Sequence, residues 1–306
     1  GGLDTTADRS SVTVAGTLAT TDTRMDLGPI TLGADTVLDT GSAAASVLNI
    51  GAVTSAGHAL LLDSGPDAAA DLTVASLGGG GALTVRDSGG TTFSGAVTAG
   101  AVTLTDTTGA ITFAGDLTAQ SLADGTDSFD LQLIGGSTSV TDPVTLASIG
   151  TLTLGDGDDD SLTFAGGLDA SGVSQTNLHG TLGTTDTPLQ LGPLETKGAS
   201  TLRSGLALTS VASLTDTADG DLTLGDNSQL GTLRFTGNAV MNEATLSTAS
   251  ATFAVEFLGA NNLFASDTTF TNYAVQFGDS SADSTTFAGG LDTTAVTNGT
   301  TAAGTL

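Results

Sequence analysis

The sequence concentrates four acidic side chains in one short run, LGDGDDD, which contains Asp156, Asp158, Asp159 and Asp160. Oxygen ligands at alternate positions are typical of calcium loops, so Asp156, Asp158 and Asp160 are the candidate ligands for Ca²⁺. The run lacks the glycine-rich nonapeptide of calcium-binding β-rolls and the terminal glutamate of an EF-hand. The alternative is a role in the turn itself, because an aspartate side chain can accept hydrogen bonds from nearby backbone amides.

The same loop occurs twice more with fewer charges. From the Asp of a shared Gly-Asp pair onward, it reads Asp226-Asn-Ser-Gln in one copy and Asp279-Ser-Ser-Ala-Asp in the other. Asp156, Asp226 and Asp279 are the aspartates that occupy the same place in all three copies. A position repeated in this way favours a turn-forming role. We therefore expect that the protein requires no cofactor, and calcium remains the alternative.

The side chains that catalysis needs are few and scattered. The two histidines are His58 and His179, and His179 stands where the related segment Val14-Ala15-Gly16 has alanine, which predicts a polar surface position. No Gly-x-Ser-x-Gly elbow is present.

A polysaccharide-processing β-helix enzyme would need carboxylates clustered with Arg or Lys along one groove. The basic residues are instead spread along the chain, at Arg9, Arg24, Arg86, Lys197, Arg203 and Arg234. We expect that the protein is not an enzyme.

The charge balance excludes two classes of partner. The chain of 306 residues carries 33 acidic and 6 basic residues, a formal net charge of −27. Without a basic patch it cannot neutralise phosphates, so we expect no nucleic acid partner and no anionic membrane surface. No run of about 20 apolar residues is present, which argues against membrane insertion. The absence of cysteine excludes disulfides and thiolate metal sites.

Short strands of alternating polarity must position all of these side chains. Between residues 82 and 120, ALTVRDSGGTTFSGAVTAG is followed by AVTLTDTTGAITFAGDLTAQ, which places Phe93 and Phe113 at equivalent positions. Alternation with a period of two indicates strands with one buried face, and Gly-rich or Asp-rich segments between them indicate turns. We predict an all-β fold, a parallel β-solenoid of about fifteen coils of about 20 residues each.

A Phe-x-Gly-x-Leu/Val unit marks the predicted coils. In this unit we expect the Phe to fill the interior, the Gly to allow a tight turn, and the next apolar residue to re-enter the core. It occurs at Phe93/Gly95/Val97, Phe113/Gly115/Leu117, Phe164/Gly166/Leu168 and Phe287/Gly289/Leu291, with smaller versions at Val14/Gly16/Leu18 and Leu178/Gly180/Leu182. The competing fold is a string of β-sandwich modules, which would show periods of about 100 residues and more aromatic residues.

Longer repeats overlie the short ones. Gly1–Leu18 and Gly289–Leu306 are identical at 12 of 18 aligned positions, and Gly16–Pro29 matches Gly180–Pro193. We predict one continuous solenoid array over residues 1–306. It contains a long repeat at about 16–179 and a shorter, related repeat at about 180–303, and a next repeat begins at 304–306.

Three runs resemble the tandem repeats of very large exported bacterial surface proteins, the filamentous-haemagglutinin and autotransporter-passenger group. They read TLATTDTRMDLGPITLGADTVLDTGSA, VTAGAVTLTDTTGAITFAGDL and TLTLGDGDDDSLTFAGGL. The resemblance covers essentially the whole chain, although the secretion-domain motifs of the haemagglutinins are not visible. It implies a right-handed parallel β-helix, export from a bacterial cell, and a role in adhesion or in extracellular fibres. It carries over no catalytic residue.

These observations lead to two functional hypotheses and a weaker third. The leading one is an extracellular structural rod that forms or extends a cell-surface fibre or matrix by stacking end to end. Its partners would be further copies of itself and cell-surface or matrix polymers. The alternative is the stalk of a bacterial adhesin whose binding tip lies elsewhere. An ice-binding surface is the third, because of the pairs Thr103/Thr105 and Thr151/Thr153, but irregular coil lengths disfavour a flat threonine column.

One sequence triplet, Asn298-Gly-Thr300, matches a glycosylation acceptor.

Overall fold

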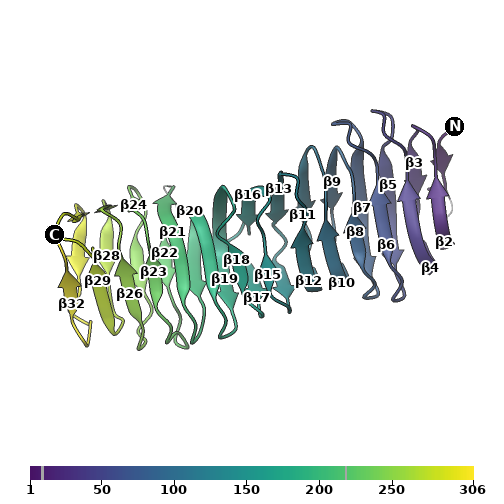
Figure 1. Cartoon of the computed structure of the whole chain (residues 1–306). Coiled ribbons are helices and arrows are strands. Elements are labelled where there is room, and N and C mark those ends of the chain that lie inside the picture. The colour runs from purple at the N-terminus through teal and green to yellow at the C-terminus, as the bar shows by residue number, and fades with distance from the viewer. Residues whose placement is uncertain (8–9, 218) are drawn as a thin grey trace. The chain divides into compact units, whose positions relative to one another are not determined.

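A computed structural model describes residues 1–7, 10–217 and 219–306, and every regular element in this part of the chain is a strand. The chain divides into two compact units. Figure 1 labels their strands. The N-terminal unit comprises Gly1–Asp142 with Ala147–Gly150, and the C-terminal unit comprises Pro143–Leu146 with Thr151–Leu306. Over these described residues, no helix is long and apolar enough to cross a membrane.

The strands of the N-terminal unit pair in parallel with strands about one coil away in the sequence. They are β1 (Leu3–Asp4), β2 (Val12–Ala19), β3 (Met25–Leu27), β4 (Ile30–Asp39), β5 (Leu48–Thr54), β6 (Leu60–Asp63), β7 (Asp71–Gly78), β8 (Leu83–Val85), β9 (Gly90–Phe93), β10 (Val97–Leu104), β11 (Ala110–Phe113), β12 (Leu117–Asp124), β13 (Phe129–Leu133) and β14 (Ser137–Val140).

Three ladders run through this unit, and each coil of the chain adds one short stretch of strand to each ladder. The first joins β1, β3, β5, β7, β9, β11 and β13. The second runs, in order, through the early parts of β2 and β4, the later parts of β5 and β7, the early parts of β10 and β12, and then β14. The third runs, in order, through the later parts of β2 and β4, then β6 and β8, and then the later parts of β10 and β12. The longest strands therefore serve two ladders.

The C-terminal unit has the same plan. Its strands are β15 (Val144–Thr145), β16 (Ile149–Leu154, of which Thr151 onward belongs to this unit), β17 (Ser161–Phe164), β18 (Leu168–Ala170), β19 (Gln175–Thr184), β20 (Leu189–Arg203), β21 (Thr209–Asp216), β22 (Leu222–Leu224), β23 (Leu233–Phe235), β24 (Ala239–Met241), β25 (Leu246–Thr248), β26 (Ala254–Phe257), β27 (Asn261–Phe264), β28 (Asp267–Thr269), β29 (Ala274–Phe277), β30 (Ser284–Phe287), β31 (Gly290–Asp292) and β32 (Thr300–Ala302).

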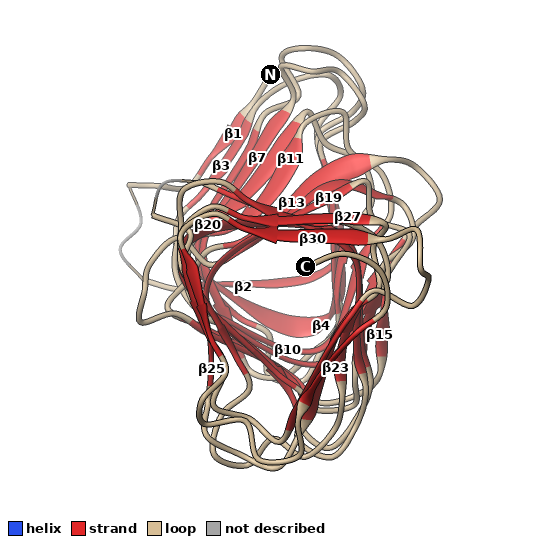
Figure 2. Cartoon of the chain, turned by 90° about the vertical axis from the view of Figure 1, so that its left-hand side faces the viewer, coloured by secondary structure: helices blue, strands red, loops and turns tan. Residues whose placement is uncertain are grey.

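Three parallel ladders again surround a narrow interior. In Figure 2, β23, β25 and β30 line three sides of it. One ladder runs β15, β18, β20, β21, β23, β26, β29, β32. A second runs β16, β19, β20, β21, β24, β27, β30. The third runs β17, β19, β20, β22, β25, β28, β31.

The predicted fold class is confirmed. The chain is an all-strand, parallel β-solenoid of about 14 turns, close to the fifteen expected from the sequence. The 20-residue period is visible at Thr112, whose hydroxyl donates to the side chain of Gln132 one coil later. Parallel pairing throughout the solenoid excludes the string of β-sandwich modules. The right-handed sense and the boundaries of the long repeats stay predictions.

Inward-facing residues stack into apolar ladders, as the alternation of the strands requires. Phe93 and Phe113 are fully buried, lie opposite each other in register, and stack with their ring centroids 4.7 Å apart. Phe235 and Phe257 repeat this arrangement at 4.8 Å in the C-terminal unit. Offset stacking at this separation adds to the burial of each ring, so identical residues at one position of successive coils stabilise the stack.

The glycines of the Phe-x-Gly-x-Leu/Val unit fit the prediction at Gly16 and Gly180, but at Gly115 glycine is required for a different reason. The prediction is that they permit a tight turn, and Gly16 and Gly180 do have positive φ values of 74° and 96°. At Gly115, however, φ is not in the positive range, and a Cβ would lie 2.3 Å from the carbonyl carbon of Gly95 in the preceding coil. Gly135 approaches Gly115 equally closely. Close contact between coils, rather than backbone conformation, excludes side chains from this column.

One core position carries a hydroxyl without a hydrogen-bond partner. Thr176 is fully buried between Leu152 and Leu194 of the adjacent coils, and within the described part of the chain its Oγ1 contacts no acceptor or donor. Replacing it with the isosteric valine removes this unsatisfied group. We expect Thr176→Val to raise the free energy of unfolding by about 1–2 kcal/mol, measured by urea denaturation.

A matched control lies one coil further on. Thr196 is equally buried, but its Oγ1 donates to the carbonyl oxygen of Gly220 at 2.6 Å. Thr196→Val should therefore lower the free energy of unfolding by about 1 kcal/mol or more. Equal effects of the two substitutions would show that the hydroxyl of Thr176 is satisfied in solution.

Candidate functional site

The acidic loop is built in the same way in its three copies. Each begins with a glycine in the left-handed region, Gly155, Gly225 and Gly278, with φ values of 76°, 76° and 71°. A side chain would be strained at this φ, so the glycine sets the direction in which the chain leaves the preceding strand. The Gly-Asp pair recognised in the sequence therefore marks one turn geometry that the chain uses three times.

The aspartate that closes the loop is not the one expected. In the acidic copy, Asp160 Oδ2 accepts hydrogen bonds from the backbone amides of Asp156 and Gly157, at 2.8 and 2.9 Å. Asp283 does the same for the amides of Asp279 and Ser280, both at 2.9 Å. The turn-forming role thus belongs to the aspartate four residues after the shared Asp, which the spacing of the acidic residues could have indicated.

The third copy agrees more closely with the prediction. Asp226 Oδ1 accepts from the backbone amide of Ser228 at 2.8 Å and from its hydroxyl at 2.6 Å. The closing position comes one residue earlier in this copy, three residues after Asp226, and is taken by the buried Gln229, whose Oε1 accepts from the amide of Ser204 at 2.8 Å. An amide in this place satisfies buried backbone groups without adding a buried charge.

Asp158 makes contacts that the sequence did not reveal. Its Oδ1 lies 2.7 Å from Nε2 of His179 and 3.2 Å from the backbone nitrogen of Ala199, which are 21 and 41 residues away. These residues belong to successive coils, so a single carboxylate connects three coils. The imidazole lies over Gly198, where a Cβ would be 2.1 Å from Nε2. We name Asp158, His179, Gly198 and Ala199 the three-coil clamp.

The position of His179 therefore differs in part from the expectation. It points outward, as its equivalence to an alanine indicated, but its side chain is only 23% exposed and is held by Asp158. The clamp borders a shallow hollow of about 470 Å³, which is also lined by Lys197, Asp219 and Asp221. Lys197 Nζ pairs with Glu195 Oε1 at 2.8 Å. The clamp and its hollow therefore gather acidic, basic and imidazole side chains on one face of the C-terminal unit.

The structure does not bring the three candidate calcium ligands together. Asp160 is turned toward the backbone of its own loop, whereas Asp158 is turned toward His179 of the next coil. In residues 1–7, 10–217 and 219–306, no group of three or more His, Cys, Asp or Glu side chains is arranged to hold a metal ion. As placed, these donors fit a turn and a clamp better than a shared calcium site.

The turn interpretation predicts that a chelator has no effect. Because the Asp160 carboxylate is satisfied by two backbone amides, the melting temperature of the purified protein should be the same with and without EDTA. A melting temperature that falls on chelation and recovers on addition of Ca²⁺ would instead establish the calcium alternative at Asp156, Asp158 and Asp160.

The clamp predicts a pH dependence of stability. The hydrogen bond from His179, together with that from the amide of Ala199, lowers the pKa of the Asp158 carboxyl below its ordinary value. A lowered pKa in the folded state means that Asp158 contributes stability above the pKa of an unfolded aspartate. That contribution is lost as the pH falls through the folded value. Asp158→Asn should therefore be less stable than the wild type at neutral pH, and the two should converge in acid.

Asp159, the exposed neighbour, is the control for this prediction. Asp159→Asn removes the same formal charge without touching the clamp, so its stability should match that of the wild type across the whole pH range. Thermal melting at a series of pH values measures both variants. A difference in melting temperature between Asp158→Asn and the wild type that persists in strong acid would contradict a stabilising role of the ionised Asp158 carboxylate.

The described basic residues lie in ion pairs rather than along a common groove. The pairs are Arg24–Asp26, Arg86–Asp63, Lys197–Glu195, Arg203–Asp226 and Arg234–Glu256. Arg9 lies outside the described residues. Arg234 and Glu256 illustrate the geometry, since they are direct neighbours in adjacent coils and their side chains meet at 2.5 Å. Arg86–Asp63, Arg203–Asp226 and Arg234–Glu256 connect one coil to the next, whereas Arg24–Asp26 and Lys197–Glu195 join residues two positions apart. These pairs do not form the groove that a polysaccharide-active enzyme would need.

The pair Arg86–Asp63 lies among several stacked carboxylates of the N-terminal unit. The guanidinium of Arg86 reaches Asp63 in the preceding coil and lies 3.9 Å from Asp39 two coils away. Burial raises the pKa of Asp87, and the carboxylates of Asp63 and Asp106 raise it further. One arginine therefore offsets repulsion among neighbouring carboxylates, which is a structural role.

The threonine pairs do not form the flat array that ice binding requires. Thr103 lies beside Thr84 in one neighbouring coil and beside Ala123 in the other. Thr151 and Thr153 lie beside Gln175 and Asn177. Since Thr84 is the one threonine among these four neighbours, the pairs are not repeated from coil to coil at one position.

The fold defines the class of this protein as a parallel β-solenoid. Comparisons with protein families, with curated proteins and with solved structures find no match.

Proposed function

We propose that this chain is an extracellular structural repeat protein, a rigid rod that forms or extends a fibre or matrix at a bacterial cell surface. The observation that carries the proposal is the uninterrupted parallel pairing of coils within each unit, around a core of stacked Leu, Val and Phe side chains. Backbone hydrogen bonds in such a stack run along the solenoid axis, so each coil stiffens its neighbours. The paired basic residues and the turn aspartates support the same conclusion.

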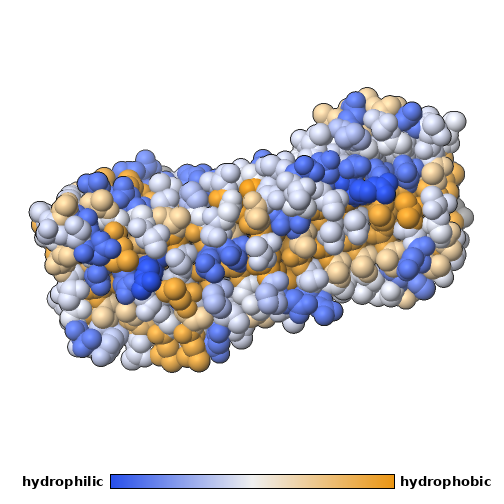
Figure 3. Space-filling view, in the orientation of Figure 1, coloured by the Kyte–Doolittle hydropathy of each residue, from blue (hydrophilic) through white to orange (hydrophobic). Residues whose placement is uncertain are grey.

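The surface is consistent with this role. On the face shown in Figure 3, hydrophobic residues gather in a band along the middle, and hydrophilic residues lie mostly to either side of it. The net charge of −27 favours solubility and keeps individual molecules from aggregating laterally through that surface. The resemblance to exported bacterial repeat proteins supports an extracellular location.

End-to-end stacking is supported by a sequence match between the first 18 and the last 18 residues of the chain. Gly1–Leu18 and Gly289–Leu306 share 12 of 18 residues. They also share one turn, because Asp4 and Asp292 each accept a hydrogen bond from the amide of the threonine two positions later, at 2.8 and 2.9 Å. Two coils of matching sequence can stack in register, with identical residues in contact. A second copy of the chain is therefore the proposed partner.

Disulfide trapping tests this stacking directly, because the chain has no cysteine. In the proposed register Thr13 of one copy lies beside Thr301 of the next, about 5 Å away, a separation that a disulfide can bridge. The double variant Thr13→Cys/Thr301→Cys should form head-to-tail disulfide polymers on mild oxidation. Thr98 is an equally exposed threonine within β10, so Thr98→Cys/Thr301→Cys is the matched control and should not polymerise in this way. Equal cross-linking of the two variants would contradict the proposed register.

A further inference from the structure

One asparagine in the chain differs from the others in its C-terminal neighbour. The chain has nine asparagines, and Asn298 is the one whose next residue is glycine. The other eight precede larger residues: Asn49, Asn177, Asn227, Asn238, Asn242, Asn261, Asn262 and Asn272. A glycine amide nitrogen is the least hindered nucleophile that the backbone offers, because no Cβ shields it. Asparagine is also among the thermally labile residues of proteins.

The structure leaves this pair open to reaction. Asn298 and Gly299 are both exposed, in the loop that connects β31 to β32. Gly299 has a φ of 106°, and a Cβ built on it would meet nothing within 4 Å. The loop is tethered by two backbone hydrogen bonds, from Asn298 N to Tyr273 O at 2.7 Å and from Val275 N to Gly299 O at 3.3 Å. The amide nitrogen of Gly299 is in neither bond.

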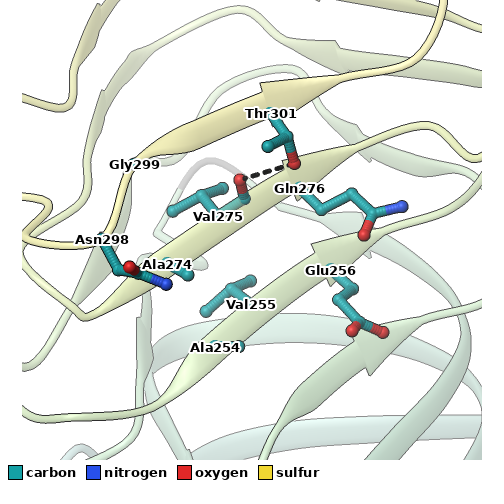
Figure 4. A pocket seen from close by; sticks show the side chains of 9 residues that line it. All are labelled: Ala254, Val255, Glu256, Ala274, Val275, Gln276, Asn298, Gly299 and Thr301. Carbon is teal, nitrogen blue, oxygen red and sulfur yellow. Dashed lines mark hydrogen bonds between the residues drawn. The ribbon is translucent and has the colours of Figure 1, made fainter.

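The side chain of Asn298 also faces water. It lies at the rim of a shallow hollow of about 170 Å³, close to Ala274 and on the same face as Glu256 and Gln276 (Figure 4). Among the residues drawn, the dashed hydrogen bond joins Thr301 to Val275 and does not involve Asn298. The side-chain amide can therefore rotate toward its own backbone.

We propose that Asn298 is a site of spontaneous deamidation. The amide nitrogen of Gly299 attacks Cγ of Asn298 and forms a new C–N bond, which closes a five-membered succinimide. The side-chain nitrogen leaves as ammonia and carries away the proton of the attacking amide. Water then opens the ring at one of its two carbonyl carbons, which yields aspartate or isoaspartate at this position. No oxidant, metal or enzyme takes part.

The product changes the connection to β32. Isoaspartate adds a methylene group to the main chain two residues before this strand, whose residues Thr300, Thr301 and Ala302 pair in register with β29. Either product also adds a negative charge on the face that carries Glu256, in a chain whose net charge is already −27. The pairing of β32 should therefore weaken with the age of the protein. This inference rests on the fold and is independent of the proposed function.

Peptide mapping of the full chain tests the proposal. After incubation of the folded protein at mildly alkaline pH, the peptide that contains Asn298 should be the first to show the mass change of amide to acid. It should also become a substrate for isoaspartyl methyltransferase. Asn227 is the internal control, since it is exposed but precedes serine, and Asn298→Gln should abolish the early product.

Two results would overturn the proposal. One is modification of Asn227 as fast as, or faster than, Asn298 in the folded chain. The other is a glycan on Asn298 in native material, because the triplet Asn298-Gly299-Thr300 also matches a glycosylation acceptor and a glycosylated side-chain nitrogen cannot leave as ammonia. Release of ammonia equal in amount to the modified peptide would confirm the route.

Discussion

Replacing Phe257 with alanine should lower the free energy of unfolding of the C-terminal unit by about 4 kcal/mol. The ring is fully buried and stacks on Phe235 with the centroids 4.8 Å apart. It also stacks on Phe277 at 5.9 Å and meets Phe264 edge-on at 5.1 Å. Truncation leaves a cavity between coils that the parallel ladders cannot close, because their register is fixed by backbone hydrogen bonds. Guanidinium denaturation followed by circular dichroism measures the loss.

Tyr273 provides the control for this aromatic core. Tyr273 is 42% exposed, so Tyr273→Ala should change the free energy of unfolding by no more than about 0.5 kcal/mol. If Phe257→Ala were as mild as Tyr273→Ala, the Phe ladder would not be the main stabilising contact in this part of the solenoid.

Gly115→Ala is expected to lower the free energy of unfolding of the N-terminal unit by about 3 kcal/mol, although it adds a single methyl group. The new Cβ would lie 2.3 Å from the carbonyl carbon and 2.6 Å from the carbonyl oxygen of Gly95. Both are backbone atoms, so the coils themselves must move apart to relieve the overlap. Thermal melting and denaturant titration of the purified variant measure this effect.

The neighbouring residue gives a control in the same turn. Ala114 is exposed, and Ala114→Val adds two carbon atoms where they can extend into solvent. Its effect should stay within about 0.5 kcal/mol of zero. A tolerated Gly115→Ala would mean that coil spacing at this turn is wider than the structure shows.

The fold class was predictable because its signals are local and repeated. Alternating polarity identifies each strand, and recurrence of the same segment about 20 residues later indicates that coils stack in parallel. The equivalence of Phe93 and Phe113 results from that recurrence, and the two rings do stack. A residue type repeated at one position of successive coils is thus strong evidence of a ladder.

The contacts between coils were not predictable, because they depend on the exact lengths of the turns. The bond between Asp158 and His179 joins residues 21 apart, and the bond from Ala199 joins residues 41 apart. The need for glycine at position 198 is visible only once the imidazole is placed over it. Likewise, sequence comparison selected Asp156 because it recurs, whereas loop closure selects Asp160.

The division into two compact units also lay beyond the sequence patterns. The repeats predict one array over residues 1–306, and nothing in composition marks the change near Asp142 and Pro143, where one unit gives way to the other along the chain. Alternation and repetition describe how each coil pairs with the next.

Electron microscopy of the full chain over a range of concentrations is the most direct test of the central claim, that coil-on-coil stacking continues from one molecule to the next. The account predicts unbranched filaments that lengthen with concentration and whose strands repeat along the axis at about 4.8 Å. Single particles that stay separate and monodisperse at every concentration would contradict it.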